Sequence, residues 1–209
     1  AMKKAVARHH AILRQSVEAN HGVIFKIIGD AIQAAFSQAT QGLAAALTAQ
    51  RLLLAEDWGE TGPIRVRVGL HTGPAELSGD DYAISHTLNR TARVMSAGHG
   101  GQILLSQEAA DLVRRELPAG ISLVDMGEHR LKGLIQLEHL YQVYASDLPT
   151  VFPTLVTEVK SEIGQIIQTK LYTPGIRPGL TPRPRLSSQF NLALQSKLVL
   201  ISAPAGFGK

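Results

Sequence analysis

Two polar residues in the middle of the chain have the types and spacing that suit phosphate chemistry. Asn89 and Arg93 lie four residues apart in HTLNRTARVMSAG, which has the pattern of a helix, so their side chains share one face. Leu88, Ala92 and Met95 form an apolar face of the same helix. A guanidinium stays protonated and its forked N–H groups match phosphoryl oxygens. On an ordinary helix such a pair is usually a solvated surface, so the spacing alone leaves both interpretations open.

Asp30 is an acidic residue at a predicted turn, where a carboxylate can cap the turn or bind a cation. It lies in a Gly-Asp turn between two short apolar runs of GVIFKIIGDAIQAAF, which is typical of a tight β-hairpin. Mg²⁺ prefers oxygen ligands and is commonly held by one or two carboxylates together with substrate phosphates. The simpler interpretation is an aspartate that only caps the turn.

A glycine-rich segment ends the sequence. Residues 197–209, KLVLISAPAGFGK, read as a buried strand that leads into a phosphate-binding loop. Gly206 and Gly208 would let backbone amides approach a phosphate, and Lys209 would reach its β and γ oxygens. Ala203 replaces the first glycine of GxxxxGK, and no helix follows Lys209 in this sequence. We therefore expect no nucleotide binding by this segment here, and we expect the chain, which begins with Ala1, to be a fragment.

Helices and hairpins alternate along the part of the chain that must position Asp30, Asn89 and Arg93. Periodicity and turn residues predict, in order, the ranges 3–19 (helix), 22–36 (hairpin), 39–56 (helix), 64–73 (strand), 86–98 (helix), 102–106 (strand), 108–117 (helix), and 122–131 with 138–145 (two strands). A polar loop is expected at 79–81. This order predicts an α+β sandwich, a mostly antiparallel sheet with helices packed on one face, rather than a doubly wound parallel sheet.

Composition divides the chain into three parts. Residues 1–146 form the folded unit, 147–185 form a linker that is proline-rich between Thr173 and Pro184, and 186–209 begin an incomplete P-loop NTPase domain. The 44% hydrophobic and 18% charged residues are typical of a folded protein. The absence of cysteine excludes disulfides and thiolate zinc sites, and it fits a cytoplasmic location.

Charge and hydropathy argue against two classes of partner. The net charge of +4 is modest and no basic patch has interleaved aromatic residues, so we expect this segment not to contact nucleic acid. DNA binding would require a helix-turn-helix beyond Lys209. No apolar run approaches the roughly 18 residues that cross a bilayer, so we expect no membrane span.

Four motifs occur in a specific order: FKIIGDAIQAAF, RVRVGLHTGPAE, LNRTARVMSAGHGGQILLS and GEHRLKGL. Together they resemble the class III adenylyl/guanylyl cyclase catalytic domain over nearly all of residues 3–146. The resemblance implies the ferredoxin-like sandwich of that family. It also implies that the first strand, with one metal-binding carboxylate and the phosphate loop that follows it, would lie upstream of Ala1. The fragment alone is then expected to be inactive.

The resemblance assigns roles in metal and base binding to residues of the predicted hairpin and of the region near the polar loop at 79–81. Asp30 matches one of two carboxylates that together hold two divalent cations, Mg²⁺ or Mn²⁺. Lys26 matches the lysine that binds the purine ring in adenylyl cyclases, which favours ATP. The companion position in base selection falls on Tyr82, so Asp81 could serve only if a one-residue bulge precedes it.

Residues after that loop match the part of the family site that acts on ribose and phosphate. Asn89 and Arg93 match the pair that orients the ribose and stabilises the charge that develops on the phosphate. Lys132 could reach the triphosphate, although a lysine in a β-turn is ordinarily just exposed. In the family these groups and the metal carboxylates come from different subunits, which implies a head-to-tail homodimer.

Two functional hypotheses follow. The first is a domain that converts ATP to cyclic AMP and pyrophosphate within a larger signalling protein, and the segment TKLYTPGIRPGLTPRPRL with KLVLISAPAGFGK resembles the start of a STAND ATPase of the maltose-activator type. The alternative is a catalytically degenerate cyclase-like module that binds nucleotide or dimerises and is coupled to that ATPase. The position of Tyr82 and the unusual AISHT segment favour the alternative.

Overall fold

The computed structural model describes residues 2–75, 77–78, 81–82 and 86–157. The chain divides into two compact units, Ala1–Glu162 and Ile163–Lys209, and all described residues belong to the first. Most of the predicted linker and the whole predicted P-loop segment therefore lie outside the described residues. Within the described part, no helix has the length and apolar character needed to cross a membrane.

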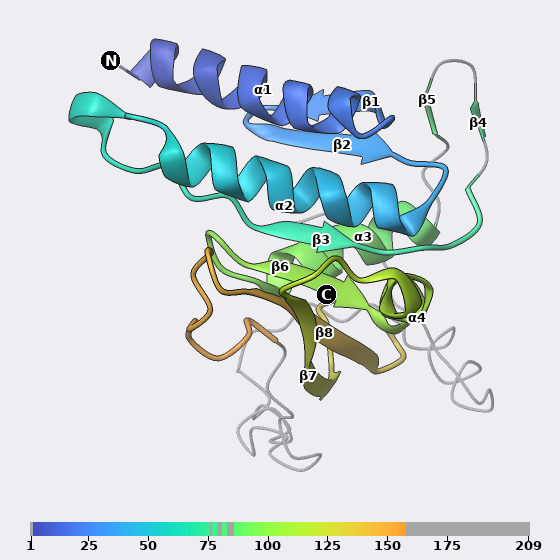
Figure 1. Ribbon diagram of the computed structural model, residues 1–209. Coiled ribbons are helices and arrows are strands. Elements are labelled where there is room, and N and C mark those ends of the chain that lie inside the picture. Colours follow the sequence, from blue (N-terminus) through green and yellow to red (C-terminus); the bar gives the residue numbers. More distant parts are fainter. Residues whose placement is uncertain (1, 76, 79–80, 83–85, 158–209) are drawn as a thin grey trace, which may run out of the picture. The chain divides into compact units, whose positions relative to one another are not determined.

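The order of elements confirms the predicted alternation (Figure 1). The helices are α1 (Met2–Ala19), α2 (Ala39–Ala55), α3 (His86–Ala97) and α4 (Gln107–Val113), with 3-10 turns η1 (Gly59–Thr61) and η2 (Arg114–Glu116). The strands are β1 (Val23–Ile28), β2 (Ala31–Ala35), β3 (Val68–Leu70), β4 (Leu77–Ser78), β5 (Asp81–Tyr82), β6 (Ile103–Ser106), β7 (Ile121–His129) and β8 (Glu138–Ala145).

Two local expectations need correction. The strand predicted over 64–73 is shorter, because only Val68–Leu70 has a ladder partner, the parallel strand β6. The preceding extended residues bond elsewhere: the Val66 carbonyl accepts from Gly101 N at 2.8 Å and from Gln50 Nε2 at 2.7 Å. The region predicted as a polar loop contains the short strands β4 and β5, which pair antiparallel.

The strands form three sheets. The largest has the order β3-β6-β8-β7, in which β3 is parallel to β6 and the other neighbours are antiparallel. The hairpin β1-β2 and the pair β4-β5 are separate two-stranded sheets. Among the described residues, β3 pairs on one edge only. The prediction of a mostly antiparallel sheet is confirmed.

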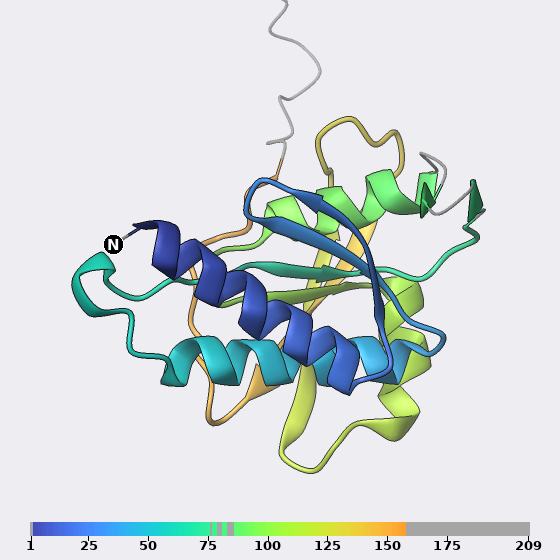
Figure 2. The same ribbon diagram turned by 90° about the horizontal axis from the view of Figure 1, so that it is seen from above.

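Helices cover both faces of the four-stranded sheet, so the prediction of helices on one face is wrong (Figure 2). Successive residues of a strand point to opposite faces. In β6, Ile103 and Leu105 join the core beneath α2 and α4, whereas Leu104 joins Val94 of α3. All four residues of β6 are buried, which fits a strand covered on two sides. The most buried residues of α3 are Val94 and Ala97, which the predicted apolar face did not include.

A buried polar network fastens the chain after β8 to the sheet. Gln102 is 1% exposed, and its Nε2 donates to Gln142 Oε1 at 2.7 Å. Gln142 Nε2 in turn donates to the Thr150 carbonyl at 2.9 Å. Further along, Val156 N donates to the Ala97 carbonyl at the end of α3 at 2.9 Å. Residues 148–156 therefore bond both to the sheet and to α3.

Candidate functional site

Helix α3, which carries Asn89 and Arg93, lies directly on β3 and the loop that follows it. A Cβ at Gly69 would lie 2.4 Å from Met95 N, so only glycine permits this approach of strand and helix. A Cβ at Gly73 would lie 2.7 Å from Thr87 Oγ1. That hydroxyl donates to the Pro74 carbonyl. Both halves of α3 are thus held by short-range contacts with one stretch of chain.

The structure brings Arg93 and the predicted Lys132 turn together. Arg93 is half-buried, and its Nε is fully buried without a hydrogen-bond partner. A Cβ at Gly133 would lie 3.6 Å from Arg93 Nη2, so the guanidinium lies against the turn that contains Lys132. The turn is closed by a hydrogen bond from Leu134 N to the Leu131 carbonyl at 3.0 Å. Two cationic residues therefore occur at one place in the fold.

Asn89 lies one turn before Arg93 on α3, and its side chain is exposed. Lys132 is also exposed. The common helix that the four-residue spacing predicted for Asn89 and Arg93 is confirmed. Asn89 on the same helix, and Lys132 next to Gly133 in the turn that Arg93 contacts, are exposed donors, and such donors with a guanidinium can bind an anion.

Two further predicted residues, Lys26 and Asp30, lie on the β1-β2 hairpin. Asp30 is exposed at the tip, beside Gly29 with its φ of 63°, in a turn bounded by the pair Ile28 and Ala31. Lys26 is partly buried in β1 and lies opposite Gln33. The hairpin packs on α1, whereas α3 packs on β3 and β6. The predicted residues thus form two groups on elements with different neighbours.

A metal at Asp30 would need further ligands. The described residues contain no group of three or more His, Cys, Asp or Glu side chains arranged to hold a metal ion. Asp30 supplies one exposed oxygen ligand of the type that Mg²⁺ or Mn²⁺ accepts. The described residues therefore fit one ligand of such an ion and not a complete site.

The remaining predicted residues are not placed in a site. The backbone of Asp81 pairs with Ser78, and that of Tyr82 with Leu77. Gly206, Gly208 and Lys209 lie outside the described residues.

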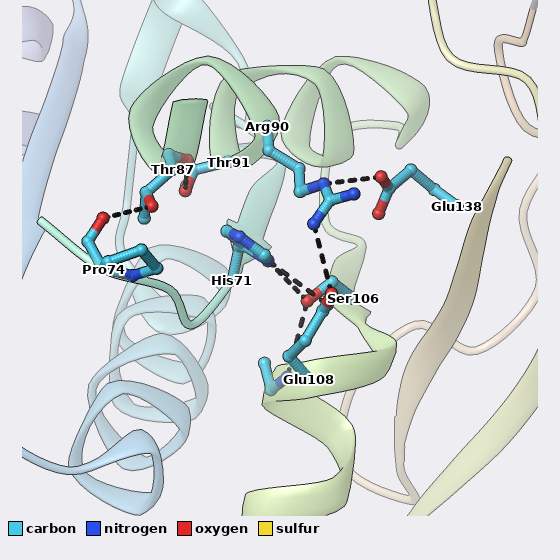
Figure 3. Close-up of polar contacts among 9 residues, drawn as sticks. His71, Pro74, Thr87, Arg90, Thr91, Ser106, Glu108 and Glu138 are labelled. Carbon is cyan, nitrogen blue, oxygen red and sulfur yellow. Dashed lines mark hydrogen bonds and ion pairs between the residues drawn. The ribbon is translucent and has the colours of Figure 1, made fainter. Parts of the chain in front are cut away.

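The structure shows a polar cluster beside α3 that was not predicted from the sequence (Figure 3). Arg90 Nε lies 2.6 Å from Glu138 Oε1, and its Nη1 lies 3.2 Å from Glu108 Oε1. His71 Nδ1 lies 2.8 Å from Ser106 Oγ, which also caps α4 by accepting from Ala109 N. The cluster joins α3, α4, the residue after β3 and the start of β8. Two signals could have revealed it: Arg90 directly follows Asn89, and Glu138 opens an otherwise largely apolar strand.

Burial sets the charges in this cluster. Burial lowers the pKa of His71 more than the charge on Glu108 raises it, so the neutral imidazole is favoured. The Ser106 hydroxyl can then donate to His71 Nδ1 while it accepts from the helix. Burial raises the pKa of Glu138 against the opposing effect of Arg90. Only 4% of the Glu138 side chain is exposed, so Arg90 is its principal charge partner.

Comparison with known proteins identifies the domain. Residues 1–145 match the family described as the adenylate and guanylate cyclase catalytic domain. The chain belongs to this family. The match confirms the resemblance to cyclase domains that the four ordered motifs indicated.

Similar sequences include uncharacterized mycobacterial proteins and an adenylate cyclase. The chain is 39% identical over 162 residues to an uncharacterized protein of Mycobacterium tuberculosis, covering 77% of this chain and 54% of the relative. The same values hold for an uncharacterized protein of Mycobacterium bovis. It is also 25% identical to receptor-type adenylate cyclase B of Leishmania donovani, over 69% of this chain and 14% of that protein. The chain thus spans about half the length of the mycobacterial relatives.

Solved cyclase structures share the fold. An adenylate cyclase of Trypanosoma brucei, solved in its monomeric state, superposes with a TM-score of 0.63 at 24% identity, covering 74% of this chain and 83% of the other. The adenylate/guanylate cyclase/hydrolase of Silicibacter pomeroyi gives a TM-score of 0.61 at 20% identity, with coverages of 70% and 86%. These likenesses confirm the predicted α+β cyclase fold.

Proposed function

We propose that this cyclase domain converts ATP to cyclic AMP and pyrophosphate. The observation that carries the proposal is the position of the Arg93 guanidinium against the Lys132 turn, with a buried Nε that has no partner. In the reaction the ribose 3′-oxygen bonds to the α-phosphorus, the bond from this phosphorus to the oxygen bridging the α- and β-phosphates breaks and releases pyrophosphate, and the 3′-hydroxyl proton passes to water. Negative charge grows on the phosphates in the transition state, and a fixed cation beside them lowers the activation free energy of the reaction.

Five of the predicted residues have a place in this proposal. Arg93 and Lys132 would contact phosphate oxygens, and Asn89, one turn away on α3, would orient the ribose. Lys26 would bind the purine, which favours ATP over GTP. Asp30 would be one ligand of a divalent cation, Mg²⁺ or Mn²⁺, and two such ions would supply charge neutralisation at the triphosphate.

A dimer would unite the two groups of residues. Lys26 and Asp30 lie on the hairpin, and the other three lie on α3 and the turn. Apolar side chains are exposed beside both groups: Ile27 is 44% and Ile28 55% exposed on the hairpin, and Ile135 is 93% exposed after the turn. An exposed apolar patch can mark a protein–protein interface. We propose that each complete site lies between two copies in the head-to-tail arrangement that the family resemblance implies.

The first test measures cyclic nucleotide formation by the intact protein with ATP or GTP and Mn²⁺ or Mg²⁺. We expect cyclic AMP from ATP, and a loss of about 10²- to 10³-fold in kcat for Arg93→Ala. The matched control is Arg14→Ala, an arginine of α1 that is 53% exposed. Nucleotide binding without turnover would instead support the non-catalytic module, and an unchanged kcat in Arg93→Ala would refute the assigned role.

The dimer has a separate test. Asp30→Asn and Arg93→Ala should each lose nearly all activity when present alone, because each removes part of every site. Mixed in equal amounts they should regain about a quarter of the wild-type activity, since about half of the dimers are mixed and each of these keeps one complete site. No recovery on mixing would contradict sites shared between copies.

The ATPase assignment of residues 186–209 stays a proposal based on sequence. It predicts that the intact protein binds ATP through Lys209. Loss of one class of ATP site in Lys209→Ala, with cyclase activity kept, would support it.

A further inference from the structure

The ion pair between Arg90 and Glu138 connects α3, which carries Arg93, to the chain that follows the Lys132 turn. Arg90 Nε is 2.6 Å from Glu138 Oε1, although Oε1 lacks a well-aligned hydrogen bond, so the pairing is chiefly electrostatic. The Glu138 side chain is 4% exposed and that of Arg90 is 28% exposed. A buried carboxylate is costly unless a cation lies beside it. The pair therefore restrains both chain segments.

Arg90 and Glu138 connect α3 to the chain that follows the Lys132 turn. Arg90 stands between Asn89 and Arg93 on α3, and Glu138 is the first residue of β8. The guanidinium of Arg93 already lies against Gly133 in the same turn. A restraint between Arg90 and Glu138 thus limits how far α3 can move relative to that turn.

We propose that Arg90 is a positioning residue whose pairing with Glu138 holds Arg93 and Lys132 at the separation that cyclisation at the α-phosphate requires. This role rests on the proposed cyclase activity. Glu108 supports it as a second, more exposed acceptor, 3.2 Å from Arg90 Nη1, which fixes the orientation of the guanidinium plane. Arg90 acts through α3 and does not itself contact the substrate.

A purely stabilising role is the competing explanation, and buried ion pairs are a poor source of stability. Replacement of such a pair by apolar residues of similar size is often neutral or stabilising. The double variant Arg90→Met/Glu138→Met should therefore fold at least as well as either single variant. It should still lack the defined geometry that the charges impose, so it separates positioning from stability.

The kinetic test uses the intact protein with ATP and Mn²⁺. We expect Arg90→Met and the double variant to lose about 10- to 100-fold in kcat with KM changed by less than about threefold, because an error near 1 Å at the reacting groups has effects of this size. Arg90→Lys should recover part of the loss, since it keeps the charge without the fork. The control is Arg51→Met, which breaks an exposed pair of equal length, 2.6 Å to Asp147.

Three kinetic results would overturn the proposal: kcat within twofold of wild type in the folded double variant, an equal loss of kcat in Arg51→Met, or a loss confined to KM. Amide hydrogen exchange gives a measure that does not depend on catalysis. Exchange should accelerate in α3 and in residues 130–137 of Arg90→Met but not in α1. Unchanged exchange would also overturn the proposal. A wild-type protein without turnover would contradict the proposed function. Hydrogen exchange in Arg90→Met would then still test whether the pair of Arg90 and Glu138 restrains α3.

Discussion

Substituting Gly69 by alanine should displace α3 and so damage activity and stability together. The new Cβ would lie 2.4 Å from Met95 N and 2.7 Å from Met95 Cα. Nonbonded contacts to carbon are favourable near 3.5–4.0 Å, so the helix and strand must separate by about 1 Å. Overpacking of this kind costs about 1–3 kcal/mol. A displacement of about 1 Å at Asn89 and Arg93 would lower kcat by about 10²-fold.

Two measurements on the intact protein check this prediction: kcat for cyclic nucleotide formation, and the thermal midpoint, which should fall by about 2–12 °C. Gly42→Ala is the control, because its Cβ would meet only side chains, with the tip of Leu70 3.2 Å away, and alanine favours the helix. Met95→Ala should not rescue Gly69→Ala, since the closest atoms belong to the backbone. Rescue by Met95→Ala, or a Gly69→Ala protein with normal kcat and midpoint, would refute the steric reasoning.

Three further predictions concern stability, measured by urea unfolding. Ser106→Ala removes the cap on Ala109 N and should cost about 0.5–2 kcal/mol, whereas Ser106→Thr should cost less; equal costs would exclude capping. Gln142→Leu leaves Gln102 Nε2 buried without its acceptor and should cost about 1–3 kcal/mol, and a neutral result would mean that water or a new partner replaces it. Burial lowers the pKa of His71 in the folded state, so its contribution to the free energy of unfolding is present above about pH 6.5 and is lost as the pH falls through the folded-state pKa. In His71→Asn this loss of stability at low pH should be smaller. An unchanged dependence of the free energy of unfolding on pH would contradict the prediction.

The elements that depend on local sequence could be predicted. Helix α3 follows from its periodicity, and the β1-β2 hairpin follows from the Gly29-Asp30 turn between apolar runs. The length of β3 could not be predicted, because it is set by pairing with β6, more than thirty residues away. The two-sided burial of β6 also depends on remote contacts, since Gly69 lets α3 cover one face while α2 covers the other.

The candidate site shows the same division. The shared face of Asn89 and Arg93 follows from their spacing alone. The contact of Arg93 with Gly133 and the pairing of Arg90 with Glu138 join positions about forty or more residues apart, so helix periodicity carries no information about them. A single glutamate at the start of a buried strand, such as Glu138, is nevertheless a usable signal, because burial of a carboxylate requires a cationic partner.

Helix α3 is restrained by contacts of three physical kinds, and this bears on how activity and stability should relate. Gly69 fixes it sterically, Thr87 fixes its first turn by a hydrogen bond to Pro74, and Arg90 fixes it electrostatically to Glu138. A helix held at several points incurs its ordering cost during folding, so less orientational freedom has to be lost when substrate binds. Turnover across variants should then follow the number of intact α3 restraints rather than the global free energy of unfolding. A variant on another element, such as Arg51→Met in α2, should leave kcat nearly unchanged whatever it does to the free energy of unfolding.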